Sequence, residues 1–503
     1  MGNGETKVDD RTQTATSFIT DYDVREVGRV QSIREFLVIA VGLPSCINGQ
    51  IVEFKGGHLG LVMVFRGEQV QILVLDLKVN LRIGDEVYNR GQLLELPVGE
   101  DFLGRIVNSL CEPVDGLGPI KSREKSFIFS DAPGVMDRVP VDQAIASGTF
   151  ALDVVIPIAK GQRQLLIGDR LTGKTTVALD AILSQKGNDI VCVYCSIGKP
   201  FSSLTTVIDL LRERDALPYT IVVDSTSSTS VGQQYLGPYT ACTLGEYFMY
   251  QGKDVIIVFD DLTKHAWTYR QISLLLERAP GREAYPGDIF YIHSQLMERA
   301  AYLKPELKGG SMTFFPIIET LQGDLTSFIP NNIVSMTDGQ ILFSTALFYK
   351  GIKPAIDFGL SVSRIGNKAQ WPAMRKLSKD LRLEYLQYQE LLQMTRLRAT
   401  GLSEDAQARL KKGELITQLI GQDRYCPVPL EGQIIYLFAL NLGMLDALSG
   451  SGIKKFKDSI LQFAKDKNPG LIEAISSTHE LTADNEEKLG EVLLEFFELL
   501  VEE

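Results

Sequence analysis

The stretch GDRLTGKT, residues 168–175, matches the pattern G-x-x-x-x-G-K-[ST] and decides the fold expected for the centre of the chain. An apolar run at residues 164–167 precedes it and predicts a buried strand, and apolar residues at helical spacing follow it. In such a strand–loop–helix unit, loop N–H groups and the positive end of the helix bind polyphosphate. The predicted nucleotide-binding residues of this loop are Gly168, Asp169, Arg170, Leu171, Thr172, Gly173, Lys174 and Thr175.

Three side chains give this loop its expected chemistry. Lys174 would place a positive charge on the phosphates, and the Thr175 hydroxyl would be a ligand of Mg²⁺. Asp260 follows an apolar run at residues 255–259, and an acid at the carboxyl end of a strand can hold that metal directly or through water. Side chains alternate along a strand, so only one of Asp260 and Asp261 should face the metal. An ordinary glycine turn and a helix cap at Asp260 are the alternatives.

The N-terminal part of the chain predicts a tail and a barrel. Its 503 residues are too many for one hydrophobic core, so about three domains are expected. Residues 1–25 are polar and predict a flexible tail. Over residues 26–97, β-prone runs alternate with Gly and Asp, which predicts a small closed antiparallel barrel. These runs lie at residues 36–41, 61–65 and 70–75.

The remaining residues predict two further domains. From 98 to 372, apolar strands alternate with helical stretches, which indicates a parallel sheet covered by helices. From 373 to 503, helical stretches dominate and predict a helical bundle. The expected strands lie at 164–167, 190–194, 220–224 and 255–259, and the expected helices at 377–394, 404–419, 433–448 and 484–503.

Composition excludes several classes of function. A net charge of −12 argues against sequence-independent binding to nucleic acid, which needs clustered Lys and Arg. No apolar run reaches about 18 residues, and the N-terminus lacks the pattern of a secretory signal, so a cytoplasmic protein is expected. Six cysteines predict no disulfide scaffold, and Cys192 and Cys195 are expected to pack inside a strand. Four scattered histidines predict no zinc site.

Three motifs together resemble the alpha subunit of F-type rotary ATP synthases. They are GDRLTGKT at 168–175, RAPGREAYPGD at 278–288 and PAIDFGLSVSR at 354–364. The resemblance extends over about residues 26–448. It implies a multidomain α/β protein, with an N-terminal antiparallel β-barrel, a central RecA-like phosphate-loop domain with a parallel sheet and a C-terminal helical bundle.

The same resemblance implies partners and cofactors. Alpha subunits alternate with beta subunits in a hexameric ring around a gamma shaft, and the loop at 280–287 resembles the bearing surface for that shaft, or is simply a rigid turn. Mg²⁺ with ATP or ADP is the implied cofactor. The implied location is the cytoplasmic face of the plasma membrane, with contact to the membrane only through the ion-translocating sector. Residues 1–17 lack the helical pattern that docks the delta subunit or peripheral stalk in related chains.

The resemblance also predicts that this chain's own site does not hydrolyse nucleotide. A hydrolytic site needs a carboxylate to orient water at the γ-phosphate. Beta subunits place Glu there and alpha subunits usually Gln, whereas the matching residue here is Lys199. A cation cannot accept the proton of that water. Lys199 either contacts phosphate or is an exposed lysine in a turn.

Further roles carry over from the family. Arg364 would be an arginine finger for the neighbouring beta site, and Ser361 would set the geometry of its loop. The adenine pocket would comprise Phe348, Lys353, Pro354, Gln422 and Arg424. Lys353 stands where Arg is common, and Arg424 where a second Gln is common. Two alternatives remain open: a catalytically active hexameric NTPase of the same fold, and a ring subunit with a vestigial nucleotide site.

Overall fold

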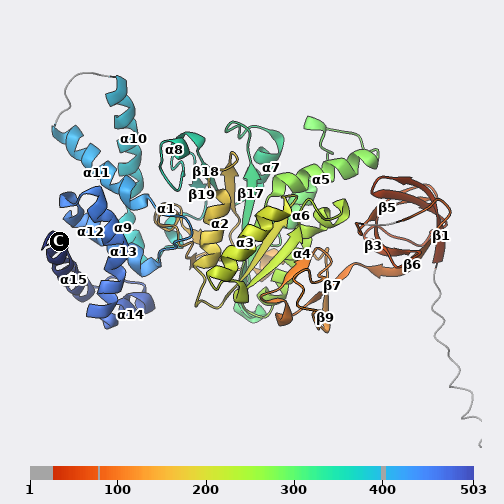
Figure 1. Cartoon of the computed structure of the whole chain (residues 1–503), viewed down its shortest axis with the longest axis horizontal. Coiled ribbons are helices and arrows are strands. Elements are labelled where there is room, and N and C mark those ends of the chain that lie inside the picture. Colours follow the sequence, from red (N-terminus) through yellow and green to blue (C-terminus); the bar gives the residue numbers. More distant parts are fainter. Residues whose placement is uncertain (1–25, 78–79, 398–403, 503) are drawn as a thin grey trace, which may run out of the picture. The chain divides into compact units, whose positions relative to one another are not determined.

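The structure is a computed structural model that describes residues 26–77, 80–397 and 404–502. These residues form two compact units (Figure 1). One unit holds the N-terminal strands and ends at Leu93, and the other runs from Leu94 onward and includes the short segment Leu75–Leu77. The tail predicted at 1–25 lies outside the described residues.

The first unit is a closed six-stranded antiparallel barrel, as predicted. Its strands follow the order β1-β2-β5-β4-β3-β6. Alternate side chains, such as Val70 and Ile72 of β5, fill the interior with others from every strand. The strands are β1 (Glu26–Arg34), β2 (Leu37–Val41), β3 (Gln50–Phe54), β4 (Leu59–Arg66), β5 (Gln69–Val74) and β6 (Glu86–Leu93).

The second unit contains a nine-stranded, mostly parallel sheet, which confirms the predicted nucleotide-binding domain architecture. Its order is β19-β18-β12-β17-β15-β13-β14-β8, and β16 pairs with β17. Only β16 and β19 pair antiparallel within this sheet of the described chain. The strands are β8 (Ile106–Asn108), β12 (Gln164–Gly168), β13 (Ile190–Ile197), β14 (Thr220–Ser225), β15 (Asp254–Asp260), β16 (Ala301–Tyr302), β17 (Ser311–Glu319), β18 (Gly339–Phe343) and β19 (Val362–Ser363).

Helices cover both faces of this sheet. Helices α2 and α3 share a hydrophobic cluster with alternate sheet residues, including Ile256 and Val258. The intervening residues face α4, where a Cβ on Gly245 would lie 2.7 Å from Ile257. Two small sheets pair β7 (Glu95–Val98) with β9 (Glu124–Phe127) and β10 (Ala144–Ile145) with β11 (Ile158–Ala159). The helices are α1 (Phe150–Val155), α2 (Lys174–Leu183), α3 (Phe201–Glu213), α4 (Val231–Met249), α5 (Leu262–Leu275), α6 (Ile289–Met297), α7 (Phe328–Met336) and α8 (Thr345–Tyr349).

The C-terminal part is helical, as predicted, but one predicted helix is interrupted and another ends earlier than expected. The stretch predicted at 377–394 is divided between α9 and α10, with Lys379 and Asp380 between them. The helix predicted at 433–448 ends at Asn441, because Gly443 adopts a left-handed φ of 70°. The helices are α9 (Pro372–Ser378), α10 (Leu381–Leu397), α11 (Glu404–Ile420), α12 (Leu430–Asn441), α13 (Gly450–Lys467), α14 (Pro469–Thr478) and α15 (Ala483–Glu502).

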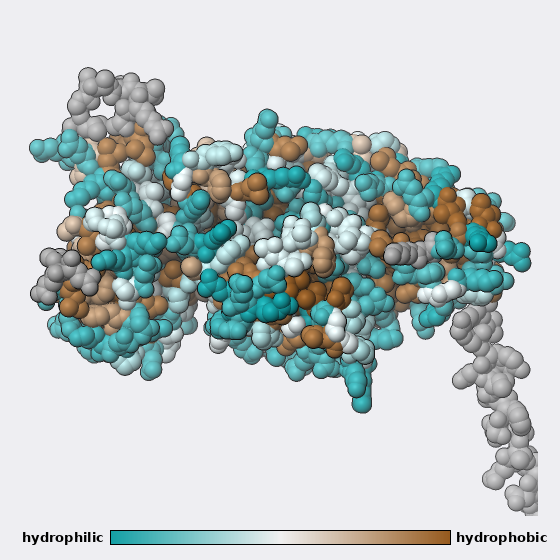
Figure 2. Space-filling model, viewed as in Figure 1, coloured by the Kyte–Doolittle hydropathy of each residue, from teal (hydrophilic) through white to brown (hydrophobic). Residues whose placement is uncertain are grey.

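On the face shown in Figure 2, hydrophobic side chains form separate patches among hydrophilic ones. Within the described ranges, no helix is both long and apolar enough to cross a membrane. Cys192 and Cys195 are buried in β13, as expected for packing residues, and burial raises the pKa of both thiols.

Candidate functional site

The phosphate loop joins the end of β12 to the start of α2. Strand pairing places Gly168, at the end of β12, beside Glu319, at the end of β17. Lys174 begins α2, and its ammonium donates to the carbonyls of Gly168 at 2.8 Å and Asp169 at 2.5 Å. The side chain is buried, and this burial lowers the pKa of Lys174 to about 8. The carbonyls of Gly168 and Asp169 therefore hold the Lys174 ammonium beside the phosphate loop.

Asp169 fastens the loop to neighbouring segments. One carboxylate oxygen accepts from the Thr320 hydroxyl at 2.7 Å and the Gly323 N–H at 2.8 Å. The other accepts from the Thr345 hydroxyl at 2.9 Å. Burial acts to raise the pKa of Asp169, but these hydrogen bonds outweigh it and leave the pKa below its ordinary value. Asp169 thus acts as a support for the loop, with both oxygens turned away from its concave side.

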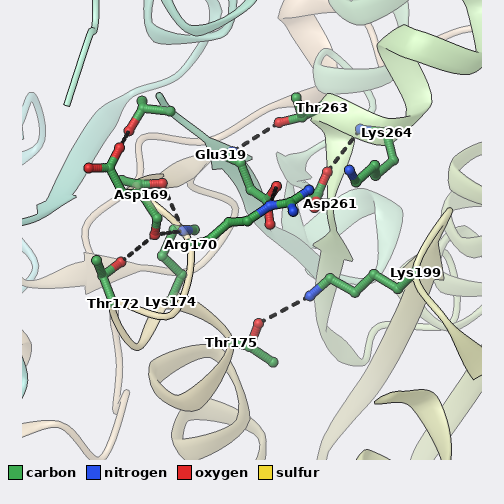
Figure 3. Close-up of polar contacts among 12 residues, drawn as sticks. Asp169, Arg170, Thr172, Lys174, Thr175, Lys199, Asp261, Thr263, Lys264 and Glu319 are labelled. Atoms are coloured by element: carbon green, nitrogen blue, oxygen red, sulfur yellow. Dashed lines mark hydrogen bonds and ion pairs between the residues drawn. The ribbon is translucent and has the colours of Figure 1, made fainter. Parts of the chain in front are cut away.

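A second cluster joins the loop to the ends of β13 and β15. Asp260 is fully buried, and one carboxylate oxygen accepts from the Thr175 and Tyr194 hydroxyls, each at 2.8 Å. Its other oxygen forms an ion pair with the Lys199 ammonium. Lys199 also lies 3.3 Å from the Thr175 hydroxyl, and Figure 3 shows the two side chains pointing toward each other. The structure therefore brings Thr175, Asp260 and Lys199 into one cluster.

Asp261 has a different role from its neighbour. Its carboxylate accepts from the Lys264 N–H at 2.9 Å and caps the start of α5 (Figure 3). Burial, with the nearby charges of Glu319 and Asp260, raises the pKa of Asp261 to about 7. Asp260 faces the phosphate loop, whereas Asp261 faces a helix end.

A cavity of about 1680 Å³ opens beside the phosphate loop. It is bounded by the loop and by segments of α8, α11 and α13, so the sheet domain and the helical part both contribute to it. The five residues predicted for an adenine pocket all line this cavity: Phe348, Lys353, Pro354, Gln422 and Arg424. Lys199 and Asp260 line it as well. The structure therefore places the predicted base-binding residues and residues 170–175 of the phosphate loop around a single cavity, whereas Gly168 and Asp169 do not line it.

The predicted pocket residues Gln422 and Lys353 differ in how many contacts hold their polar groups in place. The Gln422 amide accepts from the Phe150 N–H at 3.0 Å and donates to the carbonyls of Gly148 and Cys426, each at 2.8 Å. It therefore ties the helical part to the sheet domain. The Lys353 ammonium lies 5.3 Å from the Phe348 ring centre, within range of a cation–π contact. Lys353 is exposed, so that contact alone does not fix its position.

Two acidic residues that line the cavity, Glu319 and Asp180, were not predicted from the sequence. Glu319 ends β17 and pairs with Arg170 at 2.9 Å, close to the phosphate loop (Figure 3). Asp180 lies inside α2, and burial raises its pKa to about 7, although a backbone N–H of Tyr425 opposes this. Glu319 could have been found by the rule that selected Asp260, because it too ends an apolar strand. Asp180 could not, since its burial comes from distant parts of the chain.

The loop that carries Arg364 lies outside the residues that line the cavity. Ser361 is fully buried; its hydroxyl accepts from the Leu342 N–H at 2.9 Å and donates to the Asp357 carbonyl at 2.5 Å. Arg364 is exposed, and its N–H donates to the Asp338 carbonyl at 2.8 Å. Across residues 26–77, 80–397 and 404–502, its guanidinium forms no hydrogen bond or ion pair. Ser361 thus fixes the loop, and the charge of Arg364 is left for solvent or another molecule.

A phosphate loop at the carboxyl edge of a parallel sheet, with the acid of a nearby strand beside it, defines a class: the phosphate-loop nucleotide-binding proteins. Residues 148–363 match the nucleotide-binding domain of the ATP synthase alpha/beta family, and residues 370–496 match the C-terminal domain of its chains. The ATP synthase subunit alpha of Caldanaerobacter subterraneus subsp. tengcongensis is 43% identical over 482 residues, covering 96% of this chain and 95% of its own length. The chain therefore belongs to the ATP synthase alpha/beta family, as one of its alpha subunits.

Proposed function

We propose that this chain is a non-catalytic, regulatory alpha subunit whose cavity binds ATP or ADP. The observation that carries the proposal is the cation at Lys199, beside Thr175 and Asp260. Hydrolysis needs a carboxylate that is free to orient water, and an ammonium cannot accept its proton. Glu319 also lines the cavity, but Arg170 neutralises it. The cavity thus suits a nucleotide, and the carboxylates of Asp260 and Glu319 beside the phosphate loop are each already paired with a cation.

A second part of the proposal concerns the neighbouring subunit. Arg364, exposed and free of partners within the described residues, would act as an arginine finger in the catalytic site of an adjacent beta subunit. A guanidinium is permanently charged and presents two parallel donors to phosphate oxygens. Buried Ser361 would hold the loop in position without touching the reacting groups. This chain would therefore complete a site in which the chemistry belongs to its neighbour.

Similarity to an alpha subunit supports a proposed assembly. The chain would alternate with beta subunits around a gamma shaft, meet a delta subunit or peripheral stalk, and take part in ATP synthesis coupled to transport of protons or sodium ions. Its place would be the cytoplasmic face of the plasma membrane, reached through the ion-translocating sector. Domain limits at 26–97, 98–372 and 373–503 belong to the same proposal.

Magnesium fits this site less well than the sequence predicts. Thr175 and Asp260 are the side chains that would face the metal, but one oxygen of Asp260 already accepts two hydroxyl groups and the other pairs with Lys199. The donor set does not fit a divalent cation, so no step of this proposal is assigned to the metal.

The test is nucleotide binding and ATP hydrolysis by the purified full chain. We expect one nucleotide to bind per chain, with no turnover above that of a Lys174→Ala control. Turnover that Lys174→Ala abolishes would instead identify an active NTPase. Absence of nucleotide binding would identify a ring subunit with a vestigial site.

A further inference from the structure

Lys199 is held in place by its backbone. β13 ends at Ile197, and Gly198 follows with a left-handed φ of 59°, where a Cβ would lie 2.8 Å from the Lys264 side chain. The Lys199 carbonyl then accepts from the Ser227 N–H at 2.9 Å and from the Ser227 hydroxyl at 3.2 Å. The turn and these bonds direct the lysine side chain back to the phosphate loop. The backbone therefore fixes the position of Lys199 in the site.

The ammonium of Lys199 contacts both side chains that were predicted to face a metal. Its side chain is 21% exposed, whereas Asp260 is fully buried, so the pair is shielded from water on the Asp260 side. An ammonium carries three N–H donors. The ammonium forms an ion pair with Asp260 and donates a hydrogen bond to the Thr175 hydroxyl, so it keeps donor capacity for an oxygen in the cavity that Lys199 lines. That remaining capacity suits a phosphate oxygen.

A divalent cation at the same position would be repelled by the Lys199 ammonium. Mg²⁺ binds its oxygen ligands at about 2.0–2.1 Å and takes six of them in near-octahedral geometry. A metal bound by Asp260 would therefore lie close to the Lys199 ammonium and be repelled by it. Fully buried Asp260 has its charge balanced by the lysine already.

We propose that the Lys199 ammonium takes the place of the divalent cation, so that this chain binds ADP or ATP without Mg²⁺. Lys199 would bridge Thr175 and Asp260 to a phosphate oxygen, while Lys174 binds the phosphates from the loop. This inference rests on the proposed nucleotide-binding function. It assigns Lys199 a binding role, and it makes metal dependence a property of one residue.

The experiment is calorimetric titration of ADP into the full chain, in excess EDTA and in excess MgCl₂. For the unchanged chain we expect the two affinities to differ by less than about tenfold. For Lys199→Gln, which keeps a polar side chain but removes the charge, we expect binding in EDTA to weaken by about tenfold or more and to recover with MgCl₂. Lys199→Arg, which keeps the charge, should stay independent of the metal.

A matched control is Lys186→Gln. Lys186 pairs with Asp215 at 3.1 Å on the surface and does not line the cavity, so its loss should leave both affinities unchanged. A difference of tenfold or more in the unchanged chain overturns the inference and leaves the proposed function intact. If ADP binds in neither condition, the proposed function fails and this inference fails with it. The unchanged chain decides whether binding needs the metal, and the comparison of Lys199→Gln with Lys199→Arg decides whether Lys199 is the reason: equal affinities of a folded Lys199→Gln in EDTA and in MgCl₂ would also overturn the inference.

Discussion

Two regions of the sheet domain hold cations in opposite ways. In the cavity, Lys174 and Lys199 are engaged with this chain's own groups: loop carbonyls for Lys174, and Asp260 and Thr175 for Lys199. On the loop after β19, the Arg364 guanidinium is exposed and without a partner among the described residues. Buried Ser361 nevertheless keeps that loop in a fixed conformation.

This difference between engaged and unpaired cations explains how one domain can serve two ligands. A cation that is held by neighbouring oxygens is oriented in advance and loses little conformational entropy when a phosphate arrives. An exposed cation on a fixed loop stabilises little within its own chain, because solvent screens it, and becomes useful when another molecule covers it. The cavity is therefore assigned to this chain's nucleotide and Arg364 to a neighbour's.

The largest effect should come from Arg364. In the assembly with beta and gamma partners, we expect Arg364→Ala to lower kcat by about 10³- to 10⁵-fold, the usual effect of losing an arginine finger. Steady-state hydrolysis of ATP measures this. Arg212→Ala is the control, because Arg212 is an exposed arginine that pairs only with Asp209 at 3.0 Å among the described residues. A decrease in kcat of less than about tenfold for Arg364→Ala would contradict its proposed role as an arginine finger.

The second effect concerns the cavity. We expect Lys174→Ala to weaken binding of ADP to the full chain by about a hundredfold, because a hydrogen bond to a charged group contributes about 1.5–3 kcal/mol. Calorimetric titration measures it, with Arg364→Ala as the control that should bind normally. If Arg364→Ala weakened binding as much as Lys174→Ala, the two regions would not be separate.

The third effect is on pH dependence. The pKa of Asp180 is raised to about 7 by burial, above its unfolded value, so the folded chain keeps a proton that the unfolded chain loses. The stability of the unchanged chain should therefore fall as pH rises from about 4 to about 7. Asp180→Asn removes this loss and should be more stable above pH 7 by a few kcal/mol, at about 1.4 kcal/mol for each unit of pKa difference. Urea unfolding across this range measures the difference in free energy of unfolding between Asp180→Asn and the unchanged chain. A difference that does not grow with pH would contradict the raised pKa of Asp180.

The smallest effect concerns the loop of Arg364. Ser361→Ala leaves the buried Leu342 N–H without its acceptor, which should cost about 1–2 kcal/mol of the free energy of unfolding. Urea unfolding measures this. Exposed Ser335 is the control, and Ser335→Ala should change stability by less than about 0.5 kcal/mol. Equal effects from the two variants would show that Ser361 does not support the loop.

Local patterns predicted much of this architecture from the sequence. The barrel and the helical part follow from periodicity, because their elements bury one face, and the parallel sheet follows from continuous apolar runs, because its strands are buried on both faces. The pattern at 168–175 predicted the loop, and a strand end predicted Asp260. Helix ends were less predictable: Gly443 stops a helix whose apolar pattern continues.

What the sequence could not predict depends on contacts between distant segments. The pairing of Lys199 with Asp260 joins the ends of β13 and β15, and only their adjacency in the sheet brings these side chains together. Lys199 could therefore be read equally well as a phosphate ligand or as a turn residue. Gln422 was predicted to line a base pocket, and it does line the cavity, but its three hydrogen bonds to backbone groups were not foreseeable.

The most direct measurement is photolabelling of this chain with 2-azido-ATP in the full assembly, compared between Arg364→Ala and Lys174→Ala. We expect Arg364→Ala to keep the labelling of this chain within about twofold while turnover is lost. Lys174→Ala should lose the labelling while turnover falls by less than about tenfold. Loss of labelling in Arg364→Ala, or retained labelling in Lys174→Ala, would contradict the claim that the two regions serve different nucleotides.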